Sequence, residues 1–434
     1  MGPGTARLWH KAFLERRPTL SLGLFRLAIA CTVGAHMLPS FFHLDENFLA
    51  TAFKTKNPSF FPIWTLQLVD RSPDWLVMVW VAIFCVSLMT FALGLCSQTS
   101  CIVMTIACYY FYALNAFQIG TLSFDILLVT LVLMCVTSYH GDFLSLDALW
   151  HGNPRWYKRL RPFFVQRLLQ IQLAVTYWCT ALHKITAGGN WLTENPYCAL
   201  MHYPPTGVVR SFPGRAWLAQ HPGLCDTIGL TVIVCELLVP VLWFIPRLRA
   251  IGIALGFLFH LLLWATLHVP TIFLFLFPPM MLLFIAPESL VAWIERRQAR
   301  HAEQGRGVLV YDGQCGFCVA SVRRLRVLDL FGWLDPLDFH RQPDLEQLNP
   351  GLTPQRCRSE MMLLEPNGNL SGGFDAFAKM TQRLPLLWWL WPVIRLPGAA
   401  VIGRWVYRWI ATHRYLLHRN PTCKSNQCHA SDFN

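Results

Sequence analysis

The chain has 434 residues, of which 54% are hydrophobic and 14% are charged, and its formal net charge is +12. Soluble domains carry about 25% charged residues, so this composition excludes an ordinary soluble protein and indicates a bilayer. The positive charge does not indicate nucleic acid, because the basic residues flank apolar runs instead of forming a stripe with stacking aromatics. We therefore expect the lipid bilayer as a partner, and no nucleic acid.

Residues 1–18 form a short basic segment, and the apolar sequence after it predicts a membrane domain over residues 19–286. A helix needs about 20 mostly apolar residues to cross a bilayer. Eight segments approach this requirement, at residues 21–42, 75–96, 101–117, 122–139, 165–185, 224–245, 250–269 and 271–286. We therefore expect an α-helical polytopic membrane bundle of about eight spans.

Basic residues are unevenly distributed between the loops that connect these segments. With the N-terminus inside, Arg7, Lys11, Arg155 and Lys158 are among many basic residues on the inner side, whereas the outer loops carry few. Short loops rich in Lys and Arg stay on the cytoplasmic side. We therefore expect an integral protein of a bacterial inner membrane, with both termini and the C-terminal domain in the cytoplasm.

Several ionisable side chains fall inside the predicted spans, where each costs about 2.5–3.5 kcal/mol at a helix centre. These residues are Arg26, His36, Asp125, His183, Lys184, Glu236, His260 and His268. One interpretation is that Arg26 and Lys184 extend to the two interfaces and that the histidines bond to neighbouring helices. The alternative is that the set converges on one outward-facing pocket, since Glu236 and His260 are predicted near mid-depth.

Part of this region resembles a known family. The stretches QIQLAVTYWCTALHKITAGGNWL and CELLVPVLWFIPRLRAIGIALGFLFHLLL, with SLGLFRLAIA near the start, resemble the horizontally transferred transmembrane (HTTM) domain. The vitamin K-dependent gamma-carboxylases share this domain. The resemblance implies Lys184 as a catalytic base, with His183, Trp191, Glu236 and His260 as supporting residues. It also makes a quinone the candidate cofactor or lipidic substrate of the membrane domain.

After residue 286 the composition changes, which predicts a linker over residues 287–306 and a second domain over residues 307–434. The order of predicted elements is strand, cysteine-bearing turn, helix (319–330), strand (334–339), hairpin and helix (374–384). Pro366-Asn367-Gly368 is a strong turn signal for the hairpin. This order predicts a small thioredoxin-like α/β domain. The apolar tail at 386–410 predicts helices that cover the domain or lie on the membrane, because Pro and Arg residues interrupt it.

The sequence VYDGQCGFC carries a cysteine pair, Cys315 and Cys318, at the predicted start of a helix. The positive end of the helix dipole stabilises a thiolate on Cys315, and Cys318 follows one turn later, within reach of a mixed disulfide. Two alternatives remain open. A second pair, Cys423 and Cys428, makes a zinc site with Cys315 and Cys318 a hypothesis, and both pairs could simply pack as small hydrophobic side chains.

YDGQCGFC followed by SVRRLRVLD resembles the DCC family of thiol-disulfide oxidoreductases, and YRWIATHRY resembles that family's closing helix. The resemblance implies that Cys315 is the attacking thiol and Cys318 the resolving thiol, with Asp312 and Gly313 as supporting residues. We therefore expect a membrane thiol-disulfide oxidoreductase that exchanges electrons with a thiol or disulfide protein or a small thiol. The alternatives are a zinc-stabilised cytoplasmic binding module on a membrane scaffold, and a quinone-dependent carboxylase-like enzyme that uses Lys184 as base.

Overall fold

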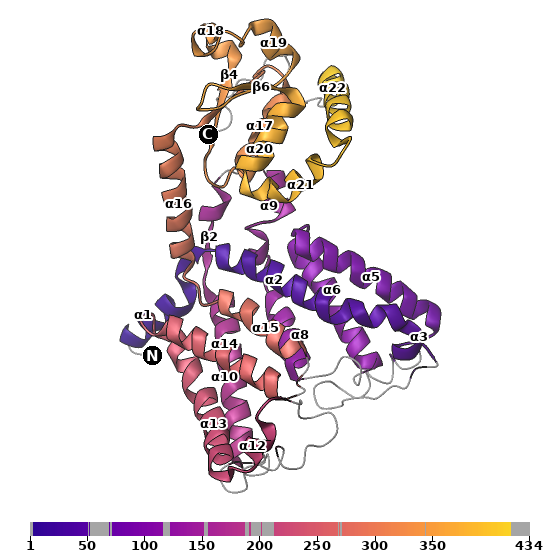
Figure 1. Ribbon diagram of the computed structural model, residues 1–434, viewed down its shortest axis with the longest axis vertical. Coiled ribbons are helices and arrows are strands. Elements are labelled where there is room, and N and C mark those ends of the chain that lie inside the picture. The colour runs from indigo at the N-terminus through magenta and orange to yellow at the C-terminus, as the bar shows by residue number, and fades with distance from the viewer. Residues whose placement is uncertain are drawn as a thin grey trace. The chain divides into compact units, whose positions relative to one another are not determined.

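The computed structural model describes residues 3–50, 52, 69, 72–115, 122–151, 155–186, 191, 201, 212–267, 269, 271–342 and 344–417 (Figure 1). The chain divides into two compact units. Unit 1 consists of Met1–Asp147 and Arg159–Pro287, and unit 2 consists of Ala148–Lys158 and Glu288–Asn434.

Each of the eight apolar segments of unit 1 forms a helix. These are α2 (Leu20–Met37), α5 (Asp74–Leu93), α6 (Ser97–Leu114), α8 (Leu122–Met134), α10 (Phe164–Thr186), α13 (Pro222–Phe244), α14 (Arg249–Thr266) and α15 (Thr271–Leu282). Shorter elements are α1 (Pro3–Trp9), η1 (His10–Leu14), η2 (Leu38–His43), α3 (Leu44–Asn47), η3 (Tyr139–Gly141) and α12 (Arg215–Ala219). A two-stranded antiparallel sheet joins β1 (Arg16–Pro18) to β2 (Leu160–Pro162).

These helices pack as a closed ring. Along the sequence, α2 packs on α5, α5 on α6, α6 on α8, α8 on α10, α10 on α13, α13 on α14 and α14 on α15, and α15 returns to pack on α2. The interior is filled by large apolar side chains, among them Phe25, Phe84, Phe111 and Trp243, each of which is fully buried. Each helix therefore buries one face inside the ring.

The outer faces of these helices remain apolar. The best 18-residue window of α5 has a mean hydropathy of 2.5 but is only 28% buried, and that of α14 has 1.6 and is 17% buried. Val86, Met89 and Leu258 are examples of large apolar side chains that are about half exposed or more. Water does not solvate such a surface, whereas lipid chains do. Unit 1 is therefore the membrane-embedded part of a membrane protein.

Among the described residues, four helices are long and apolar enough to cross a membrane, or up to six if each of two bent helix pairs is one span. Four of the eight helices, α6, α8, α10 and α15, do not pass this test by themselves. Helix α8 has 13 residues, α15 has 12 residues with Pro278 and Pro279 inside it, and α10 contains Gln170, His183 and Lys184. The eight-span topology therefore stays a prediction.

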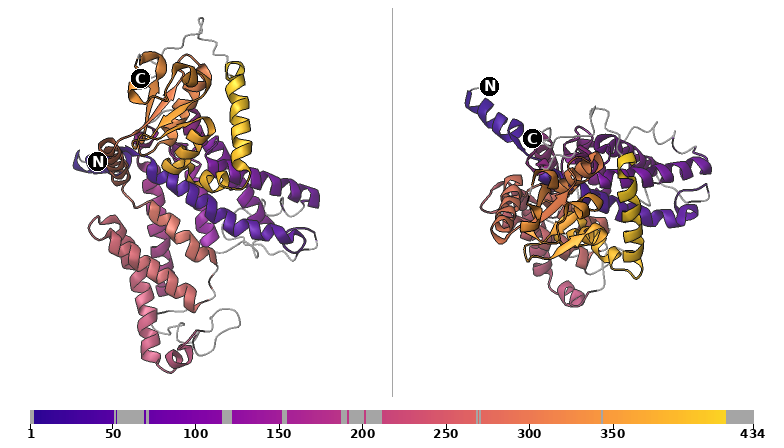
Figure 2. Two further views of the ribbon diagram at one scale, coloured as in Figure 1. Left: turned by 45° about the horizontal axis from the view of Figure 1, so that its top comes forward. Right: turned by 90° about the horizontal axis from the view of Figure 1, so that it is seen from above.

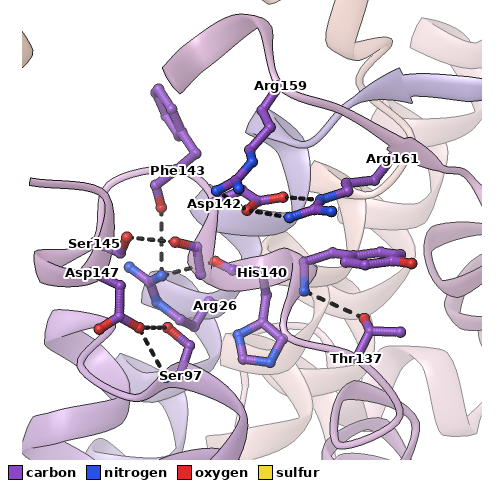
Figure 3. A network of polar contacts seen from close by, with 12 residues as sticks. Arg26, Ser97, Thr137, His140, Asp142, Phe143, Ser145, Asp147, Arg159 and Arg161 are labelled. Atoms are coloured by element: carbon purple, nitrogen blue, oxygen red, sulfur yellow. Dashed lines mark hydrogen bonds and ion pairs between the residues drawn. The ribbon is translucent and has the colours of Figure 1, made fainter. Parts of the chain in front are cut away.

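Arg26 lies in the middle of a network of backbone acceptors (Figure 3). Its Nη1 donates to the carbonyl oxygens of His140 at 2.8 Å and Phe143 at 3.4 Å, and its Nη2 donates to the carbonyl oxygen of Leu144. The side chain is 0% exposed. The loop that follows α8 therefore folds over the guanidinium and satisfies it with carbonyl groups, and the extension of Arg26 to an interface stays a prediction.

The same loop carries two carboxylates that fasten it to its neighbours (Figure 3). Asp142 accepts from Arg159 at 2.9 Å and from Arg161 at 2.8 Å. Asp147 accepts from the backbone and the hydroxyl of Ser97, both at 3.1 Å. Because all of these bonds join residues that are far apart in the sequence, the loop is held as a defined structure.

Unit 2 is built on a four-stranded mixed sheet with the strand order β4-β3-β5-β6. Its main elements are α16 (Pro287–Gln304), β3 (Gly307–Tyr311), α17 (Gly316–Leu328), β4 (Leu334–Asp338), β5 (Met362–Leu364), β6 (Leu370–Gly372), α20 (Gly373–Arg383) and α22 (Ala399–Leu417). Strands β3 and β4 are parallel and are joined through α17, whereas β5 is antiparallel to β3 and β6. Shorter helical elements are η5 (Phe339–Arg341), α18 (Leu345–Leu348), α19 (Pro354–Ser359), η6 (Pro385–Leu390) and α21 (Trp391–Ile394).

The turn signal at Pro366-Asn367-Gly368 correctly predicted the hairpin formed by β5 and β6. Gly368 occupies the left-handed region at φ +83°, and its backbone N–H closes the turn onto the carbonyl oxygen of Glu365 at 2.9 Å. Glycine adopts this conformation without the steric cost that a side chain brings. Residues 287–306, expected as a linker, are largely helical because α16 continues to Gln304.

A short segment between α8 and α10 also belongs to unit 2. It contains the end of α9 (Leu146–His151) and η4 (Trp156–Lys158). The indole Nε1 of Trp156 donates to the carbonyl oxygen of Val327 at 3.1 Å, and Lys158 pairs with Glu295 on α16 at 2.5 Å. The chain therefore contributes to this unit twice, which the sequence did not indicate.

Candidate functional site

The cysteine pair lies where β3 ends and α17 begins. Cys315 is the N-cap residue of α17, and its Sγ accepts a hydrogen bond from the backbone N–H of Cys318 at 3.3 Å. The two sulfur atoms are 2.7 Å apart, and both cysteines are free thiols. A cap position aims the Cys315 sulfur at the unpaired N–H groups of the first helical turn, which favour negative charge.

The electrostatics of the pair are asymmetric. The hydrogen bond from the Cys318 thiol, and then that from the Cys318 backbone N–H, lowers the pKa of Cys315 to about 7 against the opposing effect of burial, with a smaller contribution from the charge of Arg414. The pKa of Cys318 is raised, because its proton is held in the bond to Cys315 and burial disfavours a second charge. When the pair carries one negative charge, that charge is therefore favoured on Cys315 and the remaining proton on Cys318.

The thiol that ionises more readily is the less exposed of the two. Cys315 is only 1% exposed, whereas Cys318 is partly exposed and lines a pocket of about 520 Å³. Ionisation thus favours Cys315 as the attacking sulfur, but access favours Cys318. A reagent reaches this dithiol from the Cys318 side.

A carboxylate and its partners surround the turn before the pair. Asp312 accepts from the backbone N–H of Gln314 and from His340 Nε2, each at 3.0 Å, and lies 3.6 Å from Arg414 Nη2. Arg414 also donates to the carbonyl oxygen of Arg358. Sequence reasoning identified Asp312 but not His340 or Arg414. The only signal for Arg414 was its place in the closing-helix stretch YRWIATHRY.

Gly313 is held against β4, since its backbone N–H donates to Asp338 Oδ1 at 3.1 Å. A Cβ at this position would overlap the Asp338 carboxylate. We expect Gly313→Ala to lower the free energy of unfolding by about 1–3 kcal/mol and to disturb the cysteine turn. Thermal unfolding of the full-length protein measures this. Gly223→Ala is the matched control, because a Cβ there meets nothing within 4 Å, and equal melting temperatures for the two variants would refute the expectation.

A second polar cluster lies in unit 1, between α10 and α13. Lys184 Nζ contacts both carboxylate oxygens of Glu236, at 2.7 and 2.8 Å, and lies 5.6 Å from the ring centroid of Trp191. Lys184 and Trp191 line a pocket of about 750 Å³ together with His183 and Asp125. The structure thus brings together Trp191 and four of the eight ionisable membrane residues that the sequence singled out, which are Asp125, His183, Lys184 and Glu236.

His260 makes a separate set of contacts. Its Nε2 is hydrogen-bonded to the Tyr177 hydroxyl, and its Nδ1 lies 3.0 Å from the carbonyl oxygen of Phe273. The ring stacks between Phe273 and Phe277, with centroid distances of 4.2 and 4.5 Å. Both ring nitrogens therefore have partners within the bundle, and Tyr177 is the partner that sequence reasoning missed. His268, Cys423 and Cys428 lie outside the described residues.

The Lys184–Glu236 pair allows a direct test of coupling. We expect Glu236→Gln to lower the free energy of unfolding by up to about 3 kcal/mol, because it leaves a largely buried ammonium group without its counter-charge. The double variant Lys184→Met/Glu236→Gln is expected to recover part of this loss. A double-mutant cycle by thermal unfolding in lipid nanodiscs measures the coupling. Strictly additive effects would contradict the expectation.

A metal site has no support in the part of the chain that the structure describes. No group of three or more His, Cys, Asp or Glu side chains there could hold a metal ion. Because Cys423 and Cys428 lie outside that part, the zinc hypothesis stays a prediction.

The apolar helix bundle and the dithiol domain define the class of this molecule, a membrane protein with a C-terminal redox-type domain. The family model of the HTTM domain matches residues 16–288, and that of the DCC1-like thiol-disulfide oxidoreductases matches residues 309–420. The first match spans more than half of the chain, so the protein belongs to the HTTM family and carries a DCC1-like domain. Both resemblances identified from sequence are confirmed. No curated protein and no solved structure matches.

Proposed function

We propose that the protein is a membrane thiol-disulfide oxidoreductase whose redox centre is the Cys315/Cys318 dithiol. The observation that supports this most directly is the geometry of the pair, in which Cys315 caps α17 and its sulfur lies 2.7 Å from that of Cys318. This contact lowers the pKa of Cys315 and raises that of Cys318. A thiolate beside a protonated thiol is the arrangement that dithiol exchange requires. The β-α-β order and the β5–β6 hairpin support a thioredoxin-like fold for residues 307–434.

In this reaction a thiolate of the pair attacks a disulfide, forms a mixed disulfide and releases one thiolate of the substrate. The second sulfur of the pair then attacks the mixed disulfide, closes the Cys315–Cys318 bond and releases the second thiolate. Two electrons pass to the substrate, and the released thiolates take up two protons. The substrate is a thiol or disulfide protein or a small thiol.

Trapping the mixed disulfide tests this function. In Cys318→Ser the resolving sulfur is absent, so a Cys315-linked adduct is expected to accumulate and to be released by a reductant. Mass spectrometry of the adduct identifies its partner. Cys85→Ser is the control, because Cys85 is an exposed cysteine of unit 1 that does not line the pocket beside Cys318, and it should leave exchange unchanged. A reduced pair that never forms an intramolecular disulfide in a redox titration would overturn the proposal.

We also propose the topology that the charge bias predicts, with eight spans over residues 19–286 and both termini in the cytoplasm of a bacterium. Thiols in that compartment are kept reduced, which favours a reducing or sensing role. The reduction potential distinguishes the roles, since about −270 mV suits a reductant and about −120 mV an oxidant. Labelling of single introduced cysteines with a membrane-impermeant reagent tests the topology.

A carboxylase-like reaction centred on Lys184 is the second candidate, because Lys184, His183 and Trp191 line one pocket of unit 1. A lysine acts as a base only when neutral, so its proton would first have to leave the ion pair with Glu236. Quinone-dependent activity that Lys184→Ala abolishes would support this candidate, and activity that is unchanged in Lys184→Ala would exclude it.

A further inference from the structure

The pocket beside Cys318 is almost entirely apolar. Its volume is about 520 Å³, and it lies between α17, α20 and α22 of unit 2. Its lining includes Val322 and Leu325 from α17, Phe377 from α20, and Val406 and Ile410 from α22. A pocket of this size and polarity is typical of small-molecule sites.

A few polar groups line the same pocket. The hydroxyl of Tyr407 on α22 accepts a hydrogen bond from the backbone N–H of Met361 at 2.9 Å. A hydroxyl that accepts through its oxygen retains its own proton for donation. Ser321 and Arg414 add further donor groups to the lining. A ligand that suits the pocket is therefore mainly apolar and carries a few hydrogen-bond acceptors.

Helix α22, the long yellow helix, lies along one side of unit 2 (Figure 2). Its face that does not line the pocket is unusually apolar for a helix at the surface of a domain. Val401, Ile402 and Trp405 are each more than 60% exposed. The preceding elements η6 and α21 add exposed Trp388 and Trp389. Trp residues are enriched at membrane interfaces, where an aromatic ring lies at the headgroup level.

Charge and shape favour a bilayer surface over a membrane span for this region. Arg395, Arg404 and Arg408 are exposed beside the apolar residues, and anionic headgroups attract such side chains. The pair Pro385–Ile394 and Ala399–Arg414 is apolar enough for a span but is bent by 116°. A helix pair bent this far cannot cross a bilayer as one rod, whereas it can lie in the interface.

We propose that the pocket beside Cys318 binds a lipophilic quinone, which enters from the bilayer along α22 and exchanges two electrons with the dithiol. This inference rests on the proposed redox function and names the second substrate of the same site. A quinone matches the pocket, because its ring and isoprenoid tail are apolar and its two carbonyl oxygens accept hydrogen bonds. It also dissolves in the membrane that contains unit 1.

The chemistry balances without a further reactant. Cys315 as a thiolate takes the proton of Cys318 across the 2.7 Å contact, and the Cys318 sulfur adds to a ring carbon of the quinone. The Cys315 sulfur, after losing that proton, attacks Cys318, so that the S–S bond forms and the C–S bond breaks. The leaving quinol anion takes up protons at its oxygens. Overall, the thiolate–thiol pair loses two electrons and its one proton, and the quinone gains these two electrons, that proton and a second proton from water.

Photo-crosslinking separates binding from redox chemistry. Full-length Cys315→Ser/Cys318→Ser protein in nanodiscs of zwitterionic and anionic lipids is illuminated with an azido-ubiquinone, and labelled peptides are identified by mass spectrometry. We expect labels on α17, α20 or α22 that excess decylubiquinone suppresses. Adding Ala411→Trp, which fills the pocket, should reduce them at least tenfold, whereas the neighbouring exposed Thr412→Trp should not. Ser321→Phe from the opposite wall is the second filling variant, should the first fail to fold.

The inference is overturned if the labels lie only within residues 16–288, or if the filling variants label like Thr412→Trp. Its failure is distinct from failure of the proposed function. If a small disulfide oxidises the wild-type dithiol but the pocket is not labelled, the oxidoreductase function stands and the quinone site is refuted. If the pocket is labelled but the cysteine pair of the wild type never forms a disulfide, the quinone-binding site stands and the redox function is refuted.

Discussion

Replacing Cys315 by serine is expected to lower the rate of thiol-disulfide exchange by about 10³-fold or more, because a serine hydroxyl does not ionise near neutral pH. Cys318→Ser should retain the first attack but accumulate the mixed disulfide. The two variants therefore separate attack from resolution. Reduction of a small aromatic disulfide by the purified protein, followed by absorbance, measures both effects.

The pH dependence of this thiolate gives a sharper test. With the pKa of Cys315 near 7, ultraviolet absorbance of the thiolate should rise as the pH is raised through about 7. The signal is taken as the difference between the wild type and Cys315→Ser, which cancels the other cysteines. In Cys318→Ala the pKa of Cys315 should increase, because the largest stabilising contribution is the hydrogen bond from the Cys318 thiol.

Arg414 provides the control for that titration. Its positive charge makes a smaller contribution to the lowered pKa of Cys315, so Arg414→Gln should raise this pKa by less than Cys318→Ala does. If the wild-type difference signal instead titrates at the ordinary pKa of a thiol, about 8.5, the cap geometry at Cys315 has no electrostatic consequence and the assignment of the thiolate fails.

The sequence predicted those features of the site that depend on local pattern. The strand before Cys315, the helix after it and the turn at Pro366-Asn367-Gly368 follow from periodicity and turn chemistry, which act over a few residues. The length of the apolar runs located the eight helices of unit 1. Run length could not decide whether each helix crosses a membrane. Helix α10, for example, is long enough for a span but carries polar side chains, and only its packing explains them.

Contacts between residues far apart in the sequence, and the burial of Cys315 among them, were not predictable from local pattern. Arg414 lies about a hundred residues after Asp312, and a pattern of spacing does not show that α22 returns to the cysteine turn. Tyr177 and His260 meet across two helices for the same kind of reason. The family resemblance identified several site residues, but only the fold shows that the dithiol is reached from the side of Cys318.

The second large effect is expected at Arg26, far from either pocket. Arg26→Met should lower the free energy of unfolding by about 3–5 kcal/mol, because it removes a buried cation and leaves its carbonyl acceptors without donors. The bonds to the carbonyl oxygens of His140 and Leu144 join α2 to a loop more than 110 residues away, with sequence separations of 114 and 118. Methionine fills a similar volume, so the loss reflects hydrogen bonding more than a cavity.

Two comparisons isolate the role of the guanidinium. Arg26→Lys keeps the charge but lacks the planar fork that reaches several acceptors, so its loss should lie between those of the wild type and Arg26→Met. Arg7→Met removes an exposed arginine from α1 and should change stability by less than about 0.5 kcal/mol. Thermal unfolding in nanodiscs measures all three. An Arg26→Met protein as stable as Arg7→Met would show that the loop does not depend on Arg26. If Arg26→Lys is as stable as the wild type, charge holds the loop, and if it is as unstable as Arg26→Met, the geometry of the guanidinium holds it.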